Sequence, residues 1–313
     1  MKTPSFCPLR RLLLSLLLAC VPLGANAQTL LVSNAGDESI GRLTLDLTII
    51  DLYAFTNVGG GWPVPVSNPT AFAISGNDLF VSNPDHGVSR FNLTTGYVID
   101  SNYIDGREHR SFALSGNDFF VGLTNGWIGR FNVADGLPIK EDFITGVGAP
   151  AAMAISGNDL FLANDLDGTI SRYNLTTGQV ISTDFITGLD NPISLAISGN
   201  DLFVANSGTG GENGFVGRYN LTTGEAIDAT FVTGVSDLLS LAAYGTYLYV
   251  GMQNGINRYD ITTGDLTHSI SPAPGYVGAM VIEPAAIPEP STYAALLGAL
   301  VLGLAWRKRR GAV

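Results

Sequence analysis

The chain has 313 residues, of which 46% are hydrophobic and only 14% are charged, and it contains 38 glycines and 15 prolines. This composition is too apolar for a disordered chain, and its abundance of turn-forming residues is typical of an all-β fold. The overall net charge is −11, but residues 28–284 alone hold 9 cations and 26 anions, a net charge of −17. A body this acidic repels phosphate backbones, so nucleic acid is excluded as an expected partner.

Residues 1–27 have the features of a secretion signal. A positively charged N-terminal region precedes an apolar stretch over 12–19, and Ala25 and Ala27 occupy the small-x-small positions before a cleavage point at Gln28. The apolar stretch is too short to span the ~30 Å hydrocarbon core of a membrane. We therefore expect export through the inner membrane and removal of residues 1–27 by signal peptidase.

A second processing site is present within the same segment. Leu17-Leu18-Ala19-Cys20 resembles the lipobox of bacterial lipoproteins, which would make Cys20 the lipidated first residue of the mature protein. If cleavage occurs after Ala27 instead, both Cys7 and Cys20 leave with the signal. The mature protein then has no cysteine, which excludes thiol catalysis and a cysteine-bound metal.

The middle of the chain is an internal repeat with spacings of 40, 41 and 42 residues. Its first marker is a Ser-Gly-Asn-Asp segment, which begins at Ser75, Ser115, Ser156 and Ser198 and has a degenerate copy at Tyr244. Its second marker is an arginine followed in most copies by an aromatic residue, at Arg42, Arg90, Arg130, Arg172, Arg218 and Arg258. Six arginines thus mark six units of about 40–46 residues.

Each unit can be interpreted as four short strands. In the second unit, an apolar strand over 71–74 is followed by a hairpin turn at Gly76-Asn77, with further strands at 79–82, 88–93 and near 97–99. Small residues in the first strand of each unit suit blades that converge on an axis. Four-stranded units of this length predict a β-propeller.

The two ends of the repeat region predict that the propeller closes on itself. Residues 29–34 align with the second strand of a unit, so the first unit lacks its innermost strand, and 278–282 is an unpartnered apolar strand. Pairing the two segments would close the ring and remove its exposed sheet edges. The sequence therefore predicts an all-β, six-bladed propeller over residues 28–284, with seven blades as the alternative.

The pattern within each unit resembles NHL-type propellers and their gluconolactonase-like relatives. The residues that carry the resemblance are Asn68-Pro69 and Asn191-Pro192 before a first strand, then Gly-Asn-x-Leu-x-Val-x-Asn and an arginine-bearing strand. The gluconolactonase resemblance implies a metal held by a glutamate on an innermost strand together with Asn and Asp. The matching stretches, which begin at Thr70, Ser111, Ala152, Ser194 and Ser240, contain no acid. A lactonase-like hydrolase or lyase with a metal at the channel mouth is therefore the alternative function rather than the main one.

Two sets of polar residues are candidates for binding a divalent cation, and no other cofactor is expected. The first set occupies one repeat position at the end of the second strand, in four units: Asn34, Asn83, Asn164 and Asn206. These side chains would ring one mouth of the channel and hold a cation or a sugar; alternatively, each caps the turn that follows it. The second set is Asp165 and Asp167, which begin a calcium-type loop that lacks its closing glutamate.

The remaining polar repeats are expected to be structural. We expect the repeated arginines to pair with the repeated aspartates Asp78, Asp118, Asp159 and Asp201 through charge-assisted hydrogen bonds. The histidines His86, His109 and His268 fall in different units and are expected at solvated loop or edge positions. No catalytic residue can be assigned, and the sequence favours a binding or structural role over an enzymatic one.

Two insertions, over 56–68 in the second unit and 207–215 in the fifth, are the asymmetric features of the ring, and such loops are where a ligand would be expected. The first insertion carries the candidate residue. It contains Gly59-Gly60-Gly61-Trp62-Pro63, and an exposed Trp62 would stack on the face of a sugar. The alternative is that Trp62 is buried beneath the insertion. We therefore regard Trp62 as a candidate ligand-loop residue.

The C-terminal segment 285–313 has three parts in a fixed order. Pro288-Glu289-Pro290 comes first, an apolar run over 293–306 follows, and the basic residues Arg307, Lys308, Arg309 and Arg310 come last. This order resembles the PEP-CTERM sorting signal. The apolar run spans only ~21 Å as a helix, less than the ~30 Å hydrocarbon core, and the basic end should stay cytoplasmic.

The resemblance implies cleavage by an exosortase, a membrane protease of Gram-negative bacteria that make extracellular polysaccharide. A permanent single-span anchor is the alternative. We expect a protein that is transiently anchored and then delivered to the cell envelope, outer surface or extracellular matrix, with exopolysaccharide or an envelope protein as its partner.

Overall fold

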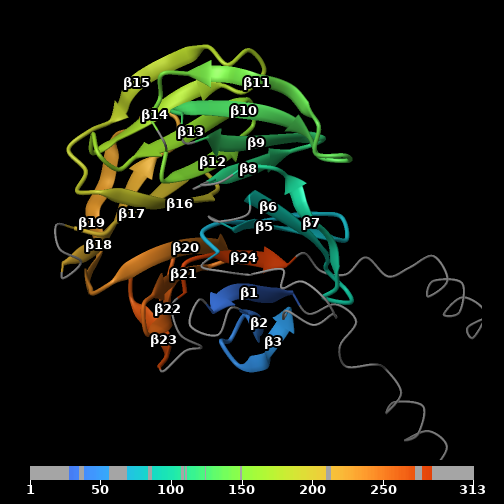
Figure 1. Cartoon of the computed structure of the whole chain (residues 1–313). Coiled ribbons are helices and arrows are strands. Elements are labelled where there is room, and N and C mark those ends of the chain that lie inside the picture. Colours follow the sequence, from blue (N-terminus) through green and yellow to red (C-terminus); the bar gives the residue numbers. More distant parts are fainter. Residues whose placement is uncertain are drawn as a thin grey trace, which may run out of the picture. The chain divides into compact units, whose positions relative to one another are not determined.

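The computed structural model describes residues 28–34, 39–55, 69–83, 87–106, 109, 111–123, 125–148, 150–208, 213–271 and 277–283. These residues contain 24 strands in six four-stranded antiparallel sheets, and no helix (Figure 1). The all-β prediction and the count of six blades rather than seven are confirmed. The expected signal peptide and C-terminal helix lie outside the described residues.

Blades 2 to 6 each follow the chain from an innermost to an outermost strand. Blade 2 consists of β4 (Phe72–Ser75), β5 (Asp78–Asn83), β6 (Gly87–Asn92) and β7 (Val98–Ile104), and blade 3 of β8 (Phe112–Ser115), β9 (Asp118–Leu123), β10 (Trp127–Asn132) and β11 (Pro138–Thr145). Blade 4 consists of β12 (Ala152–Ser156), β13 (Asp159–Asn164), β14 (Thr169–Asn174) and β15 (Val180–Ile186). Blade 5 consists of β16 (Pro192–Ser198), β17 (Asp201–Asn206), β18 (Gly214–Asn220) and β19 (Ala226–Val235), and blade 6 of β20 (Leu238–Tyr244), β21 (Tyr247–Met252), β22 (Gly255–Asp260) and β23 (Leu266–Ile270).

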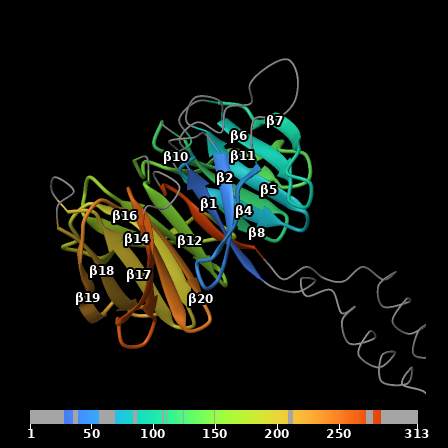
Figure 2. The same cartoon turned by 90° about the horizontal axis from the view of Figure 1, so that it is seen from below.

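Blade 1 is assembled from both ends of the propeller. Its strands are β24 (Met280–Glu283), β1 (Thr29–Asn34), β2 (Ser39–Thr44) and β3 (Ile49–Phe55), in that order across the sheet. β24 pairs antiparallel with β1, from Thr29 opposite Glu283 to Val32 opposite Met280. Figure 2 shows the blue strands β1 and β2 of this blade from below. β24 also contacts β4 and β20, so the innermost strands form an unbroken circle. The predicted closure is confirmed, although the closing strand begins two residues later than expected.

The hairpin between the first two strands of a blade depends on its glycine. Gly76 has φ of 59°, and the equivalent glycines of blades 3 to 6 have φ of 58–60°. The residue that follows, asparagine in blades 2 to 5 and threonine in blade 6, is not in the left-handed region, so the turn has its positive φ only at the first central position. This is the pattern of a type II′ turn, in which glycine is preferred because it has no Cβ.

The core lies between neighbouring sheets and is built around one aromatic position per blade. This position is in the middle of the second strand and is fully buried in five blades, at Phe80, Phe120, Phe161, Phe203 and Tyr249. Each ring lies directly across the strand pair from the repeat arginine; Phe161, for example, is opposite Arg172. Burying an aromatic side chain of this kind contributes about 1.5–3 kcal/mol. Blade 1 has the fully buried Leu31 at this position, opposite Arg42, so the repeat places a large apolar side chain there in every blade.

The repeat arginine organises the polar end of each blade. Its guanidinium donates to the aspartate at the start of the second strand, at 2.6 Å in Arg90–Asp78, Arg130–Asp118, Arg172–Asp159 and Arg218–Asp201. The predicted pairing is thus confirmed. The guanidinium also stacks on aromatic rings: the centre of the Arg172 group lies 5.8 Å from the ring of Phe161 and 5.3 Å from that of Phe185.

The same arginines reach the next blade. Nη1 of Arg172 donates to the backbone carbonyl of Thr222 at 3.0 Å, and Arg90 and Arg218 make equivalent bonds to Ala134 at 3.3 Å and Thr262 at 3.2 Å. We use the term arginine clamp for the arginine, its carboxylate and this carbonyl. The clamp joins two strands of one blade to a turn of its neighbour, which explains why it recurs around the ring.

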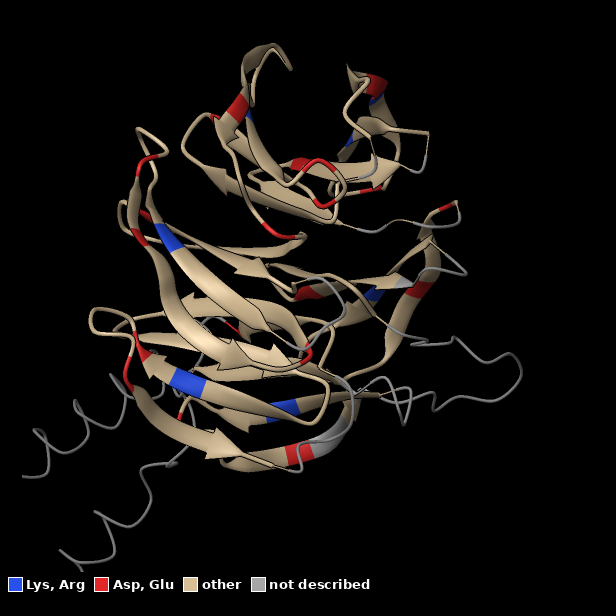
Figure 3. Ribbon diagram, turned by 90° about the vertical axis from the view of Figure 1, so that its left-hand side faces the viewer, with Lys and Arg blue, Asp and Glu red and all other residues tan. Residues whose placement is uncertain are grey.

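Charged residues lie on the outermost strands, whose outer edges have no partner strand in the described structure. Acidic residues outnumber basic ones around the ring (Figure 3). Five of the six outermost strands carry an acid, at Asp51, Asp100, Asp142, Asp184 and Asp228. Charge on a sheet edge opposes pairing with another chain, so these residues protect the ring from edge-to-edge association.

Candidate functional site

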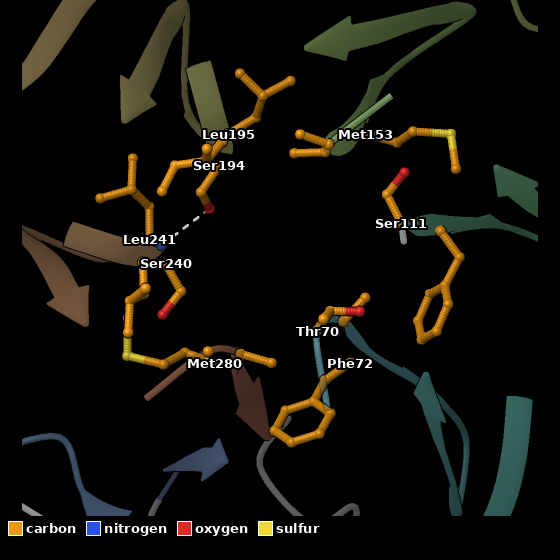
Figure 4. A pocket seen from close by; sticks show the side chains of 17 residues that line it. Thr70, Phe72, Ser111, Met153, Ser194, Leu195, Ser240, Leu241 and Met280 are labelled. Carbon is orange, nitrogen blue, oxygen red and sulfur yellow. Dashed lines mark hydrogen bonds between the residues drawn. The ribbon is translucent and has the colours of Figure 1, made fainter. Parts of the chain in front are cut away.

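The channel along the propeller axis is small, and its described lining carries no charge. The residues before and within the six innermost strands enclose a cavity of about 120 Å³, and none of its 17 lining residues is charged (Figure 4). The lining combines small residues, mostly alanine and serine, with larger apolar ones such as Phe72, Met153 and Leu241. Ligand pockets usually measure roughly 300–1,000 Å³. The channel is therefore too small for a typical ligand, and its described lining has too few titratable groups for a catalytic site.

Serine hydroxyls of the channel wall join neighbouring blades. Ser111 Oγ donates to the carbonyl of Pro150 at 2.7 Å, and Ser240 Oγ donates to that of Val277 at 2.8 Å. Ser194 Oγ accepts the backbone N–H of Leu241 at 3.0 Å (Figure 4). Each of these bonds crosses a blade boundary. The hydroxyls therefore stabilise the ring, as expected for polar groups buried near its axis.

The four candidate asparagines end the second strands of four blades, at equivalent positions. The two whose side chains are described bond locally: Asn164 Nδ2 donates to the hydroxyls of Thr169 and Ser171, both at 3.0 Å. Asn206 is fully buried; its Oδ1 accepts the N–H of Asp190 at 3.2 Å and its Nδ2 donates to Val204. Neither residue lines the axial channel. A cation or sugar held by Asn34, Asn83, Asn164 and Asn206 together remains a prediction.

The calcium-type loop forms the turn between β13 and β14. Asp167 lines a crevice of about 220 Å³ together with Asn164 and Asp184, and Asn164 Oδ1 is buried there without a hydrogen-bond partner. Among the described residues, no three His, Cys, Asp or Glu side chains are placed to hold a metal ion. A calcium ion at Asp165 and Asp167 therefore also remains a prediction.

His109 contradicts the expectation that the histidines are solvated. Only 3% of this residue is exposed, whereas His268 is exposed on β23 and His86 lies outside the described residues. The connection between blades 2 and 3 holds His109 in place because the Ser82 hydroxyl donates to its carbonyl oxygen. Gly106 has φ of 130° and packs against the ring, since a Cβ at this position would lie 3.1 Å from the imidazole.

The imidazole of His109 is an unsatisfied polar group. Both ring nitrogens are buried, and neither makes a hydrogen bond of good geometry with another described residue. Burial lowers the pKa of His109, and the nearby Asp105 opposes this effect only in part. A buried polar group without a partner costs about 1–3 kcal/mol. One sequence feature indicates this burial: Gly106, three residues earlier, has no Cβ and so leaves room for the imidazole.

His109 lies at a crevice between blades 2 and 3. We call it the blade 2–3 crevice; it measures about 330 Å³ and is lined by Asp105, Gly106, His109, Leu123, Asn125, Phe131 and Glu141. Its size lies within the range of ligand pockets, roughly 300–1,000 Å³. This crevice therefore combines adequate volume with several polar groups, which the axial channel does not.

Several candidate residues fall outside the described residues. They are Trp62, the signal-cleavage residues Ala25 and Ala27, and the tail residues Pro288, Glu289, Pro290, Arg307, Lys308, Arg309 and Arg310. The described part of the chain contains no candidate membrane-spanning helix.

Comparison with known proteins identifies the tail. Residues 286–310 match the family model of the PEP-CTERM protein-sorting motif, which confirms the resemblance noted above. No curated protein matches the chain.

Solved structures support the fold alone. A chain of a nidogen/laminin complex is 14% identical with a TM-score of 0.60, and the match covers 82% of this chain and 98% of that one. The structure of U3-55K is 15% identical with a TM-score of 0.56, covering 81% and 84%. The designed protein Ika8 is 19% identical with a TM-score of 0.50, covering 81% and 76%. The NHL and gluconolactonase likeness remains a prediction.

A PEP-CTERM motif marks an exported protein for exosortase processing at a C-terminal membrane anchor. The chain is therefore an exported, exosortase-sorted protein of the envelope or the cell exterior, whose body is a six-bladed β-propeller.

Proposed function

We propose that the propeller is a binding or structural module that retains extracellular polysaccharide, or an envelope protein, outside the inner membrane. One observation carries this proposal: the axial channel, on which the enzymatic alternative depends, has no charged residue in its described lining and measures only about 120 Å³. Its hydroxyls already bond across blade boundaries. No described feature favours the alternative of a hydrolase or lyase at the channel mouth.

The tail supports the same role. In the proposed sequence of events, signal peptidase removes residues 1–27 and the C-terminal segment anchors the chain. An exosortase then cleaves near Pro288-Glu289-Pro290, and the propeller is released to the envelope or matrix. β24 ends at Glu283, before this motif, so cleavage there leaves the ring closed.

The experiment expresses the full chain in a Gram-negative host with and without an exosortase. Cells are fractionated, and the propeller is followed into membrane, soluble and polysaccharide fractions. We expect exosortase-dependent transfer to the polysaccharide or envelope fraction, and mass spectrometry should find a mature chain that begins at Gln28 and lacks Trp306. A chain in which Pro288, Glu289 and Pro290 are all replaced by alanine serves as the matched control and should stay in the inner membrane.

Three results would count against parts of the proposal. A processed propeller that is freely soluble and retains neither polysaccharide nor envelope protein overturns the binding role. A mature chain that still carries Trp306 supports a permanent anchor. A lipidated N-terminus at Cys20 would replace signal-peptidase cleavage after Ala27.

A further inference from the structure

The blade 2–3 crevice has a buried floor and an exposed polar rim. His109 and Phe131 form the floor and are 3% and 7% exposed. Asp105, Asn125 and Glu141 are exposed and form the rim. The floor is therefore shielded from water, while the rim is open to an incoming molecule.

The polar groups of the crevice are suited to accepting hydrogen bonds from hydroxyls. The carboxylates of Asp105 and Glu141 offer several acceptor positions, and Asn125 Oδ1, which accepts the backbone N–H of Trp127 at 3.0 Å, has one further lone pair. The imidazole nitrogens of His109 are buried in the floor and make no hydrogen bond with the other described residues. The described lining contains no lysine or arginine, so these described residues present only like charge to an anionic ligand.

The floor of the crevice continues into an apolar side. Phe131 and Leu123 face the cavity, and Trp127 is the direct cross-strand neighbour of Leu123, which places the two side chains on the same face of the sheet. Trp127 is 39% exposed. Aromatic surface beside hydrogen-bond acceptors suits a ring that has an apolar C–H face and hydroxyls around its edge.

The next interface around the ring shows which of these features are general. A crevice occurs at the equivalent place between blades 3 and 4, where Tyr173, Asn164 and Thr183 stand at the positions of Phe131, Leu123 and Glu141. That crevice is smaller, about 220 Å³, and no histidine lines it. The crevice itself is thus a product of the repeat, whereas the unpartnered histidine and the Glu141 carboxylate are particular to blades 2 and 3.

We propose that the blade 2–3 crevice binds one ring of a neutral, polyhydroxylated ligand, that is, a single sugar residue of a larger saccharide. The ring stacks on Phe131 near Trp127, and its hydroxyls donate to Asp105, Asn125 and Glu141. This inference rests on the proposed function, because it assigns the site at which the propeller holds polysaccharide.

The experiment measures binding of methyl glycosides to the full exported chain in detergent, by saturation-transfer NMR and titration calorimetry. The probes are the neutral methyl glycosides of glucose, galactose, mannose and N-acetylglucosamine, with glucuronate and methylamine as charged comparisons. We expect at least one neutral glycoside to bind. Glu141→Gln should weaken it about tenfold, which is the loss of one hydrogen bond to a charged acceptor.

Two further variants locate the site. Glu225→Gln changes an exposed glutamate of blade 5 in the same way and should leave binding unchanged. His109→Phe fills the floor and should abolish binding; its melting temperature shows whether the ring still folds, and the exposed Glu141→Gln variant tests the site independently of that result.

The outcomes separate this inference from the proposed function. Retention of polysaccharide that Glu141→Gln and folded His109→Phe both leave unchanged overturns the crevice assignment but not the binding role. Binding of glucuronate or methylamine in place of the neutral glycosides overturns the ligand class. If neither glycosides nor polysaccharide bind, the proposed function fails as well.

Discussion

The arginine–carboxylate pairs of blades 2 to 5 and those of blades 1 and 6 are built from different parts of the chain. In blades 2 to 5 the aspartate lies 12 to 17 residues before the arginine, within the same blade. In blade 1, Thr29 takes the place of that aspartate, and Glu283 supplies the carboxylate to Arg42 from 241 residues away. In blade 6, Arg258 bonds Asp46 of blade 1, which is 212 residues away.

This difference shows how a repeat becomes a closed ring. The local arginine–aspartate pairs can form as soon as the strands of one blade form, whereas the two long-range pairs form only when the ends of the propeller meet. Arg42 holds Glu283 through two bonds, of 2.8 and 3.1 Å, and also donates to the carbonyl of Leu93 in blade 2 at 3.0 Å. Closure is thus fixed at a residue that stands five positions before Pro288 of the sorting motif.

The largest effect should come from removing the closing strand. A chain that ends at Ala279 lacks β24, including the pairing with β1 and the buried side chain of Met280. We expect a loss of roughly 5 kcal/mol in the free energy of unfolding, from several backbone hydrogen bonds and one buried apolar side chain. Denaturant unfolding of this chain is compared with one that ends at Pro284, which should be as stable as the full propeller. Equal stability of the two truncated chains would show that β24 is not needed for closure.

Removing a local clamp should have the next largest effect. Arg172→Ala deletes the bond to Asp159, the bond to the Thr222 carbonyl of blade 5 and the stacking on Phe161 and Phe185. We expect a loss of about 2–3 kcal/mol, because Asp159 is also left without its partner. Thermal unfolding of Arg172→Ala measures this loss of stability. An unchanged melting temperature would mean that the clamps are dispensable.

The two long-range carboxylates should differ from each other. Glu283→Gln weakens a pair whose side chains are 18% and 23% exposed, and we expect a loss of about 1–2 kcal/mol. Asp46→Asn removes a carboxylate that is 86% exposed, and exposed pairs contribute only about 0–1 kcal/mol. Urea unfolding of both variants tests the ranking. If Asp46→Asn proved the more harmful, the closure would depend on blade 6 rather than on Glu283.

The contact between blades 6 and 1 should respond to alkaline pH. Tyr249 is fully buried and donates to the carbonyl of Leu45 at 2.9 Å, and burial raises its pKa to about 12. A raised pKa means that its contribution is complete below the unfolded value of about 10 and is lost as the pH rises through 12. Tyr249→Phe should lower the free energy of unfolding by about 1 kcal/mol at neutral pH. Between pH 10 and 12 the free energy of unfolding of this variant should fall less steeply with pH than that of the unchanged protein. The measurement is the free energy of unfolding of both proteins at a series of alkaline pH values. If Tyr249 did not contribute, the two free energies would fall with pH at the same slope.

The smallest effect concerns one turn of blade 6. Asp260 stands where blades 2 to 5 have asparagine, and hydrogen bonds from the backbone N–H groups of Thr262 and Thr263 lower its pKa. A lowered pKa gives a contribution that is present above the unfolded value, near 3.8, and is lost as the pH falls through the folded value. Asp260→Asn should therefore make the melting temperature slightly less sensitive to acid below about pH 4. Identical acid profiles would contradict this.

Much of the fold could be predicted from the sequence because the repeat is local. The Gly-Asn turns, the arginine–aspartate spacing and the apolar strands each lie within about 40 residues of chain, and they gave the strands, the clamps of blades 2 to 5 and the six blades. The candidate site was predicted less well. The asparagine positions were located correctly at strand ends, but burial of His109 was missed because it depends on Ser82 and Gly106 in the connection between two blades.

The sequence by itself therefore determined that this protein is exported and sorted, and that its folded domain is a propeller. Both a sorting motif and a repeat are linear patterns, which a sequence shows directly. Only the tertiary structure decided which carboxylates complete Arg42 and Arg258, how small the axial channel is, and where an unpartnered histidine meets an open crevice. These features arise where segments more than 200 residues apart, or side chains of different blades, are brought together. No local period reports such contacts, because their partners are set by the closure of the ring.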